Sequence, residues 1–343
     1  MTRRIFIVNA ALATLLTMGV ASGQQVLINA AGATFPYPMY SKWFDEYHKK
    51  FPSIQINYQS IGSGGGIQQV TAGTVDFGAS DGPMTDMQLQ AFQSKRGSEI
   101  LHFPTVMGAV VPTYNIPGVT GSLNFTGEAL AGIFLGKITK WDDPELTKAN
   151  PGVKLPSKNI VVVHRSDGSG TTYVWVDYLS KVSKEWEMKV GKATSVNWPV
   201  GLGGKGNEGV SGSIQQTANS IGYVELIYAI QNKMAYGKVK NASGEFIQAS
   251  LASVTAAAAS MKNMPEDFRV SITNAPGKGV YPISSFTWLL IPSKIADAAK
   301  KKAIKDFLTW MLGDGQKMTE ALSYAQLPAP VIAKEVKAIG KIQ

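Results

Sequence analysis

The chain of 343 residues contains 44% hydrophobic and 17% charged residues, a composition that is typical of a folded globular protein and excludes an intrinsically disordered one. Its length predicts two domains rather than one small core. The absence of cysteine excludes disulfides, thiolate metal sites and thiol nucleophiles, and the three histidines, His48, His102 and His164, are not spaced for a shared zinc ion.

Residues 1–23 have the pattern of a secretory signal peptide, with two arginines, a mostly apolar run and small residues ending at Gly23. Polar residues interrupt the apolar run, which argues against the alternative of a retained membrane anchor. No cysteine lies near the expected cleavage point, so lipid attachment there is excluded. We expect an exported, periplasmic protein that is not lipidated.

The remaining chain is basic. Removing the two arginines of residues 1–23 from the 33 basic residues leaves 31 against 24 acidic residues, a net charge of +7 that would attract small anions. Nucleic-acid or membrane binding would also suit this charge. However, no dense run of Lys and Arg is interleaved with aromatic residues, and Lys300–Lys302 are interpreted as the solvated face of a helix. We therefore expect no nucleic-acid partner.

The first part of the chain alternates between predicted strands and helices. Strands are expected at 26–30, 53–60 and 75–81, and helices at 38–51, 67–72 and 85–94. This order predicts a parallel α/β sheet. Thr34, Ser63 and Asp81 each follow the C-terminal end of one of these strands, where such sheets bind ligands, so we expect the three side chains to converge on one site.

Two long apolar stretches, 103–115 and 281–291, are expected to cross between two lobes. Between them lies a second predicted α/β set, with helices at 126–135, 173–182 and 210–219, strands at 160–163 and 221–224, a glycine-rich loop at 201–209 and a less regular, Ala-rich segment at 237–280. Helices at 295–312 and 315–322 and the tail beyond 330 are expected to rejoin the first lobe. We expect two α/β lobes joined by a two-segment hinge, lobe I comprising 24–104 plus 283–343 and lobe II comprising 105–282, with the ligand cleft between them.

The stretch 164–172 predicts a second part of the site, because it joins a β-branched strand to the start of a helix. Free N–H groups at the helix start, the hydroxyls of Ser169 and Thr171 and the guanidinium of Arg165 would form a receptor for an oxyanion. The alternative is that Ser169 or Thr171 is only an N-cap and Arg165 only a surface charge. Asp167 is expected to hold the guanidinium, to cap the helix, or to do both.

Asp81 is the unusual member of this group, because a carboxylate repels an anion unless the anion itself carries a proton. Phosphate near neutral pH carries at least one O–H, and sulfate carries none. A buried unpaired polar group costs about 1–3 kcal/mol, and more when it is charged, so Asp81 is predicted to favour phosphate over sulfate. The alternative is that Asp81 only caps the segment at Gly82-Pro83.

Other patterns that could carry chemistry are weak. The glycines of 201–206 match G-x-G-x-x-G, but no clear strand precedes them, no suitably placed acidic residue follows, and Lys205 is not followed by Ser or Thr, which argues against nucleotide sites. No G-x-S-x-G elbow of a hydrolase is present. Asp142 and Asp143 are interpreted as a helix cap rather than metal ligands. We expect no catalytic residue, no metal and no cofactor.

At these residues the chain resembles the periplasmic phosphate-binding proteins of ABC-type uptake systems, the PstS family. The resembling strings are Ala31–Pro36, Ile61–Gly66, Val75–Asp81, Phe103–Val106, Leu135–Asp142, Arg165–Thr171, Gly201–Asn207 and Ile221–Glu225. The resemblance covers nearly all of 26–330 and is weakest at 237–280. It implies these phosphate ligands: Thr34, Phe35 through its backbone, Ser63, Asp81, Arg165, Ser169, Gly170 through its backbone, and Thr171. Gly64, where a second serine is common, and Ser166, where a small apolar residue is common, depart from the family pattern without replacing a ligand.

The resemblance also implies the type II periplasmic-binding-protein fold, closure of the lobes around the ligand, and delivery of phosphate to the membrane permease subunits of an ABC transporter. It implies a carrier that performs no reaction, and we expect a monomer. Two alternatives stay open. The chain could be a receptor for another protonated tetrahedral oxyanion such as arsenate, or an exported phosphate-scavenging or phosphatase-like protein.

Overall fold

The computed structural model describes residues 25–343 apart from residue 262, and the signal-peptide prediction for 1–23 lies outside these residues. The fold is built around one mixed nine-stranded sheet. Its strands lie in the order β2 (Ile54–Ser60), β1 (Val26–Gly32), β3 (Phe77–Ser80), β12 (Ser284–Pro292), β4 (Ile100–Asn115), β8 (Ser220–Glu225), β6 (Val161–Arg165) and β7 (Leu202–Gly204), and β9 (Ala235–Tyr236) also pairs with β4. The predicted α/β class is confirmed.

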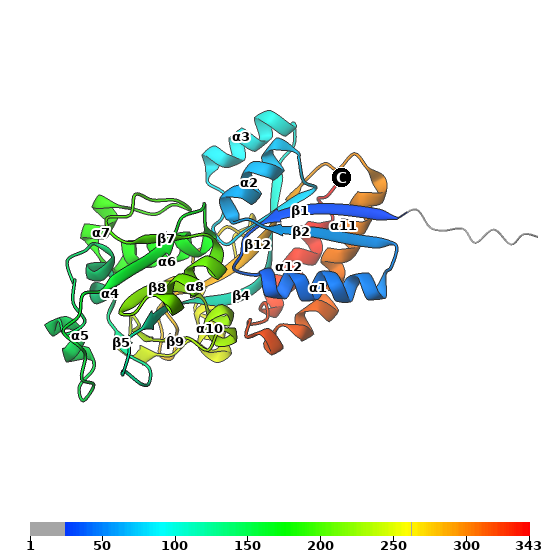
Figure 1. Cartoon of the computed structure of the whole chain (residues 1–343). Helices are drawn as coiled ribbons and strands as arrows, with labels where there is room; N and C mark the ends of the chain where they lie inside the picture. The colour runs from blue at the N-terminus through cyan, green and yellow to red at the C-terminus, as the bar shows by residue number, and fades with distance from the viewer. Residues whose placement is uncertain (1–24, 262) are drawn as a thin grey trace, which may run out of the picture.

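The first half of the sheet contains β2, β1, β3, β12 and the start of β4. Strands β1, β2 and β3 are parallel, as their alternation with helices predicts. The helices of this half are α1 (Tyr37–Lys50), α2 (Ser63–Ala72), α3 (Asp86–Arg96), α11 (Ala298–Trp310) and α12 (Ala329–Ile339). Figure 1 shows that N-terminal (blue to cyan) and C-terminal (orange to red) segments build this side of the molecule together.

The second half of the sheet contains the end of β4 with β8, β6 and β7, and the middle of the chain (green to yellow in Figure 1) builds it. Its helices are α4 (Gly127–Phe134), α5 (Pro144–Ala149), α6 (Gly170–Val182), α7 (Lys184–Lys189), α8 (Gly206–Gln216), α9 (Leu226–Gln231) and α10 (Leu251–Ala259). A small sheet of β11 (Phe246–Ile247), β10 (Lys238–Lys240) and β5 (Asn124–Phe125) completes it. Asp143 is the N-cap of α5, which confirms its interpretation as a helix cap.

Strand β4 belongs to both halves of the sheet. Its residues 100–109 pair with β12, whereas 110–115 pair with β8. A second connection runs beside it, because the Val110 N–H donates to the Ile283 carbonyl at 2.9 Å and the Tyr281 hydroxyl donates to the Val110 carbonyl at 2.9 Å. The two stretches expected to cross between lobes therefore lie side by side. The lobe boundaries at 104/105 and 282/283 remain a prediction.

Two segments differ from the expected secondary structure. The helix expected at 315–322 is replaced by two short 3-10 turns, Gln316–Met318 and Glu320–Leu322, which follow a π turn at Met311–Gly315. The buried amide of Gln316 explains the change, because it donates to the Thr105 carbonyl at 2.8 Å and accepts from the Leu327 N–H at 2.9 Å. The expected loop 201–209 contains the short strand β7 and the start of α8. No described helix is long and apolar enough to span a membrane.

Glu335 of α12 is buried, and neither of its carboxyl oxygens has a hydrogen-bond partner among the described residues. Burial raises the pKa of this carboxyl well above its ordinary value of 4.5. The folded protein therefore keeps a proton that the unfolded chain releases above pH 4.5. Stability consequently falls as the pH rises from 4.5 towards the folded pKa, by about 1.4 kcal/mol per pH unit.

Glu335→Gln is expected to remove this loss, because the amide keeps the shape of the protonated acid and does not titrate. In urea denaturation, its free energy of unfolding should exceed that of the wild type by at least about 1 kcal/mol at pH 7.5 and nearly match it at pH 4.5. Glu320→Gln, at an exposed glutamate, is the control and should show no such pH dependence. Equal stability of Glu335→Gln and wild type at both pH values would contradict the prediction.

Candidate anion-binding site

Three parallel strands of the first half end at one place and carry polar residues there. Thr34 follows β1, Ser63 is the first residue of α2 after β2, and Asp81 follows β3 directly. All three are buried, with at most 2% of their surface exposed. The Asp81 N–H donates to Ser63 Oγ at 3.3 Å, and the Ser63 hydroxyl donates to Asp81 Oδ2 at 3.5 Å. Parallel strand ends thus bring Ser63 and Asp81 into contact.

Asp81 is held by a residue that the sequence did not indicate. Thr287 of β12 donates its hydroxyl proton to Asp81 Oδ1 at 2.8 Å. Burial raises the pKa of Asp81 to about 7, although the hydrogen bond from Thr287 and the charge of Arg165 both act to lower it. Asp81 does not cap the Gly82-Pro83 segment, because the Gly82 N–H donates to Ser80 Oγ at 3.2 Å instead. Its carboxylate is therefore left to interact with Thr287, Ser63 and a ligand.

Arg165 and Asp167 form a buried ion pair at the end of β6. Arg165 donates from Nε to Asp167 Oδ1 at 2.7 Å and from Nη2 to Oδ2 at 2.5 Å. Burial by itself raises the pKa of Asp167, but the hydrogen bonds and charge of Arg165 outweigh it and hold that pKa below its usual value. Asp167 also accepts from the Gly206 N–H at 3.0 Å. Asp167 therefore holds the guanidinium in place and caps the start of α8, while Ser169 caps α6.

The start of α6 reaches across to the first half of the site. The Gly170 N–H donates to Ser63 Oγ at 3.0 Å, and the Gly64 N–H donates to the Gly168 carbonyl at 2.8 Å. A Cβ at position 170 would lie 2.5 Å from both Asp81 Oδ2 and Ser63 Oγ, so only glycine permits this approach. Residues far apart in the sequence thus line one buried region.

Three further polar residues, which the sequence analysis did not name as ligands, form hydrogen bonds with the expected ligands. Asn207, in the first turn of α8, donates from Nδ2 to Thr34 Oγ1 at 2.7 Å and to Thr171 Oγ1 at 3.1 Å. Tyr228 donates to the Thr34 carbonyl at 2.6 Å. Tyr324 donates to the Phe35 carbonyl, also at 2.6 Å. The available signal was Asn207 itself, a polar residue at a helix start directly after a glycine-rich loop.

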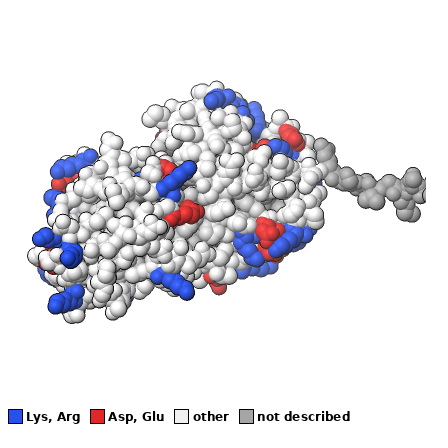
Figure 2. Space-filling view, in the orientation of Figure 1, with Lys and Arg blue, Asp and Glu red and all other residues white. Residues whose placement is uncertain are grey.

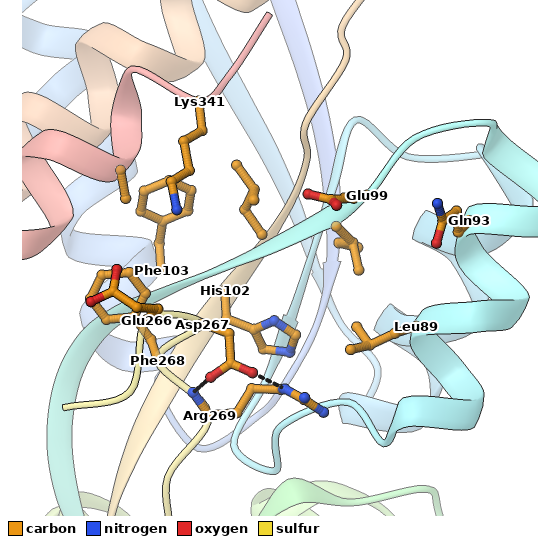
Figure 3. Close-up of a pocket in the computed structure, with 13 residues that line it drawn as sticks. Leu89, Gln93, Glu99, His102, Phe103, Glu266, Asp267, Phe268, Arg269 and Lys341 are labelled. Atoms are coloured by element: carbon orange, nitrogen blue, oxygen red, sulfur yellow. Dashed lines mark hydrogen bonds and ion pairs between the residues drawn. The ribbon is translucent and has the colours of Figure 1, made fainter.

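A separate cavity of about 340 Å³ lies between α3, the start of β4 and residues 266–269 (Figure 3). Arg269 pairs there with Asp267 and donates to the Met84 carbonyl at 2.9 Å. The Met84 N–H donates to Nε2 of His102 at 3.1 Å. Burial lowers the pKa of His102 to about 3, so the ring stays neutral and can accept this bond. The cavity wall therefore holds the loop that follows Asp81.

Charged side chains elsewhere on the surface do not gather in one place. Figure 2 shows basic groups scattered over the visible face, several of them beside acidic groups. Many form short ion pairs along helices, such as Lys302 with Asp306 at 2.5 Å. Among the described residues, no three His, Cys, Asp or Glu side chains are placed to hold a metal ion together.

A fold of this topology, with a buried donor-rich region where its two halves meet, defines a class of solute-binding proteins. A sequence profile described as the PBP superfamily domain matches residues 19–315. A phosphate-binding protein PstS of Xylella fastidiosa (strain Temecula1) is 49% identical over 317 residues, which cover 92% of this chain and 85% of the relative. The chain belongs to the PstS family within the PBP superfamily.

Solved structures agree on the fold. A high affinity periplasmic phosphate-binding protein bound with phosphate superposes with a TM-score of 0.71 at 22% identity, covering 91% of this chain and 93% of that one. An ABC-type phosphate transport receptor from Vibrio cholerae superposes with a TM-score of 0.57 at 17% identity, covering 88% and 100%. These comparisons confirm the predicted type II periplasmic-binding-protein fold.

Proposed function

We propose that this protein is a high-affinity receptor for inorganic phosphate that acts outside the cytoplasm and delivers its ligand to the permease subunits of an ABC importer. The observation that carries the proposal is the buried carboxylate of Asp81 among hydrogen-bond donors. Membership of the PstS family and the resemblance to an ABC-type phosphate transport receptor support it.

The proposed ligands are Thr34, the Phe35 backbone, Ser63, Asp81, Arg165, Ser169, the Gly170 backbone and Thr171. Most of these groups are donors, and they include a guanidinium whose planar fork suits two oxyanion oxygens. The starts of α2 and α6 add backbone N–H groups and a partial positive charge. Asp81 is the acceptor, so the ligand that satisfies every group is a tetrahedral anion with its own O–H.

A carrier binds its ligand tightly when it replaces the ligand's water shell with many hydrogen bonds in one step. Ser63 and Asp81 lie in proposed lobe I, and Arg165, Gly170 and Thr171 lie in proposed lobe II. Closing the lobes would bring these groups onto the anion together, and opening them would release it. This division of the ligands supports a transport role rather than a catalytic one. A monomer suffices for it, because every proposed ligand lies in one chain.

Export is proposed from the arginines and the apolar run of residues 1–23. An exported phosphatase of this fold would need a nucleophile beside a base or a group of metal ligands, and we assign neither. A p-nitrophenyl phosphate assay with added divalent metals tests that alternative directly. Turnover in that assay would favour the phosphatase reading over the carrier.

Isothermal titration of the protein without residues 1–23 tests the proposed function. At pH 8.5, phosphate is expected to bind tightly at one site, and sulfate is expected to bind at least about tenfold more weakly, because Asp81, with its pKa of about 7, must first be protonated to donate to it. Arsenate carries the same protons as phosphate and serves as the competing protonated anion. Equal binding of phosphate and sulfate, or no phosphate binding, would overturn the proposal.

Asp81→Asn is expected to relax the rejection of sulfate, because the amide can donate a hydrogen bond where the carboxylate cannot. At pH 8.5, where wild-type Asp81 is mostly ionised, sulfate affinity should rise at least about tenfold in the variant and phosphate affinity should fall, so that the ratio of the two affinities narrows. Asp86→Asn, at an exposed carboxylate five positions along the chain, is the control and should leave the ratio unchanged. Competition titration measures the ratio of phosphate to sulfate affinity. An unaltered ratio in Asp81→Asn would show that Asp81 does not discriminate between the two anions.

Sulfate binding to the wild type is expected to depend on pH, because burial raises the pKa of Asp81 to about 7. The protonated carboxyl can donate to sulfate, and the carboxylate cannot. Sulfate affinity should therefore be level below pH 7 and fall by up to about tenfold per pH unit above it. Asp81→Asn should bind sulfate without this dependence. Titrations from pH 6 to pH 8.5 check both curves, and parallel curves would contradict the prediction.

Gly170→Ala is expected to block closure, because the added Cβ would lie 2.5 Å from Ser63 Oγ and Asp81 Oδ2. Phosphate affinity should fall at least about 100-fold, the effect of losing more than one charge-assisted hydrogen bond. Gly212→Ala in α8 is the matched control, because a Cβ there meets nothing within 4 Å. Small-angle scattering in excess phosphate should show a larger radius of gyration for Gly170→Ala alone. A wild-type profile and affinity would contradict the prediction.

A further inference from the structure

We propose that Asn207 is a positioning residue that fixes the direction of two hydroxyl protons, so that Thr34 and Thr171 can only donate to the anion. The proposal rests on the proposed function and deepens it. It assigns to Asn207, a residue outside the ligand set, control over which protonation state of the anion the site accepts.

The orientation of the Asn207 amide follows from its neighbours. Its Oδ1 accepts from the backbone N–H of Glu225 at 3.0 Å, and a backbone N–H can only donate. The amide nitrogen must therefore face the opposite way, toward the two hydroxyls. Asn207 is fully buried, so no water competes for these bonds from the solvent side.

Each hydroxyl has both acceptor positions filled. Thr34 Oγ1 accepts from Asn207 Nδ2 at 2.7 Å and from the Asn207 backbone nitrogen at 3.3 Å. Thr171 Oγ1 accepts from Asn207 Nδ2 at 3.1 Å and from Arg165 Nη1 at 3.4 Å. A hydroxyl has two lone pairs and one proton. Only the proton remains, so each hydroxyl is a donor towards the site.

The fixed donor direction of the two hydroxyls decides which oxygen atoms of an anion they can bind. A free hydroxyl rotates and can accept from an O–H of the ligand as readily as it donates to a bare oxygen. Held by Asn207, Thr34 and Thr171 favour bare oxygens, which leaves Asp81 to receive the proton of the anion. Without the amide, the site would discriminate less sharply against anions that carry an additional proton.

A double-mutant cycle separates this role from simple packing. Asn207→Leu keeps the size and removes the two donors, and Thr34→Val removes the hydroxyl that Asn207 orients. Phosphate affinity by isothermal titration should fall about tenfold in each variant. Asn207→Leu should cost clearly less in the Thr34→Val background, where only the Thr171 hydroxyl remains to be oriented. Thr172→Val is the matched control, because the buried Thr172 hydroxyl bonds Tyr223 and not Asn207. Combined with Thr172→Val, Asn207→Leu should keep its whole effect.

The expected results support the proposal only together. If Asn207→Leu costs the same factor with and without the Thr34 hydroxyl, Asn207 acts through packing and the proposal is overturned. Phosphate affinity measured from pH 5.5 to 8.5 gives a second readout. Asn207→Leu should lose more affinity at pH 8 than at pH 5.5, whereas a purely structural loss would be equal at both.

Neutron diffraction from deuterated wild-type crystals reads the hydroxyl directions directly. The deuterons of Thr34 and Thr171 are expected to point away from Asn207 Nδ2. A deuteron that points at Asn207 overturns the inference whether or not the protein binds phosphate. Absence of phosphate binding by the wild type, with the deuterons placed as expected, would instead overturn the proposed function alone.

Discussion

The proposed site depends on one buried carboxylate, Asp81, which forms no ion pair with any residue that the structure describes. Arg165 is near enough to influence its pKa, yet the guanidinium is committed to Asp167 through two hydrogen bonds. Asp167 thus occupies two donors of the guanidinium, which acts on Asp81 only through its charge, and Asp81 keeps its capacity to accept. Burial of an unpaired charge is costly, as the pKa of about 7 reflects. A ligand that brings its own proton relieves this cost, and one that brings only bare oxygens increases it.

The geometry around Asp81 depends on how the sheet is divided. Strand β4 pairs with β12 along 100–109 and with β8 along 110–115, so both halves share one continuous strand. The strand ends of the first half and the start of α6 can therefore face each other across a short distance. Small residues make the contact possible: Gly64 meets Gly168, and Gly170 meets Ser63 and Asp81. The departure at Gly64 from the serine common in the family lies at this contact.

Local sequence patterns predicted much of the fold. Alternation of strands with helices predicted the parallel order of β1 to β3, and the three polar residues after them fall where that order places them. The turns at 311–322 were not predictable, because the long-range contacts of Gln316 with Thr105 and Leu327 override local helical spacing. The roles of Thr287 and Asn207 could not be predicted from the sequence for the same reason. Their hydrogen-bond partners, Asp81 for Thr287 and Thr34 and Thr171 for Asn207, are distant in sequence. The periodicity of apolar residues predicts which face of a helix or strand a residue occupies. It does not predict which side chain from another part of the chain contacts that residue.

The buried hydroxyls and the Asp81 carboxylate together suggest how the proposed site could distinguish anions that carry different numbers of protons. Ser63 Oγ accepts from the Asp81 and Gly170 N–H groups, just as Thr34 and Thr171 accept from Asn207. All three hydroxyls are thereby turned into donors, although the Ser63 hydroxyl donates to Asp81 Oδ2 at 3.5 Å in this structure, and Asp81 stays the acceptor. In the proposed phosphate site, selection would then depend on the number of protons that the anion carries rather than on its charge. Arsenate matches phosphate in that number, so hydrogen-bond polarity does not separate the two. If the proposed site closes on the anion, the close approach of Gly170 to Ser63 and Asp81 would instead respond to size, because a larger anion would hold these groups further apart.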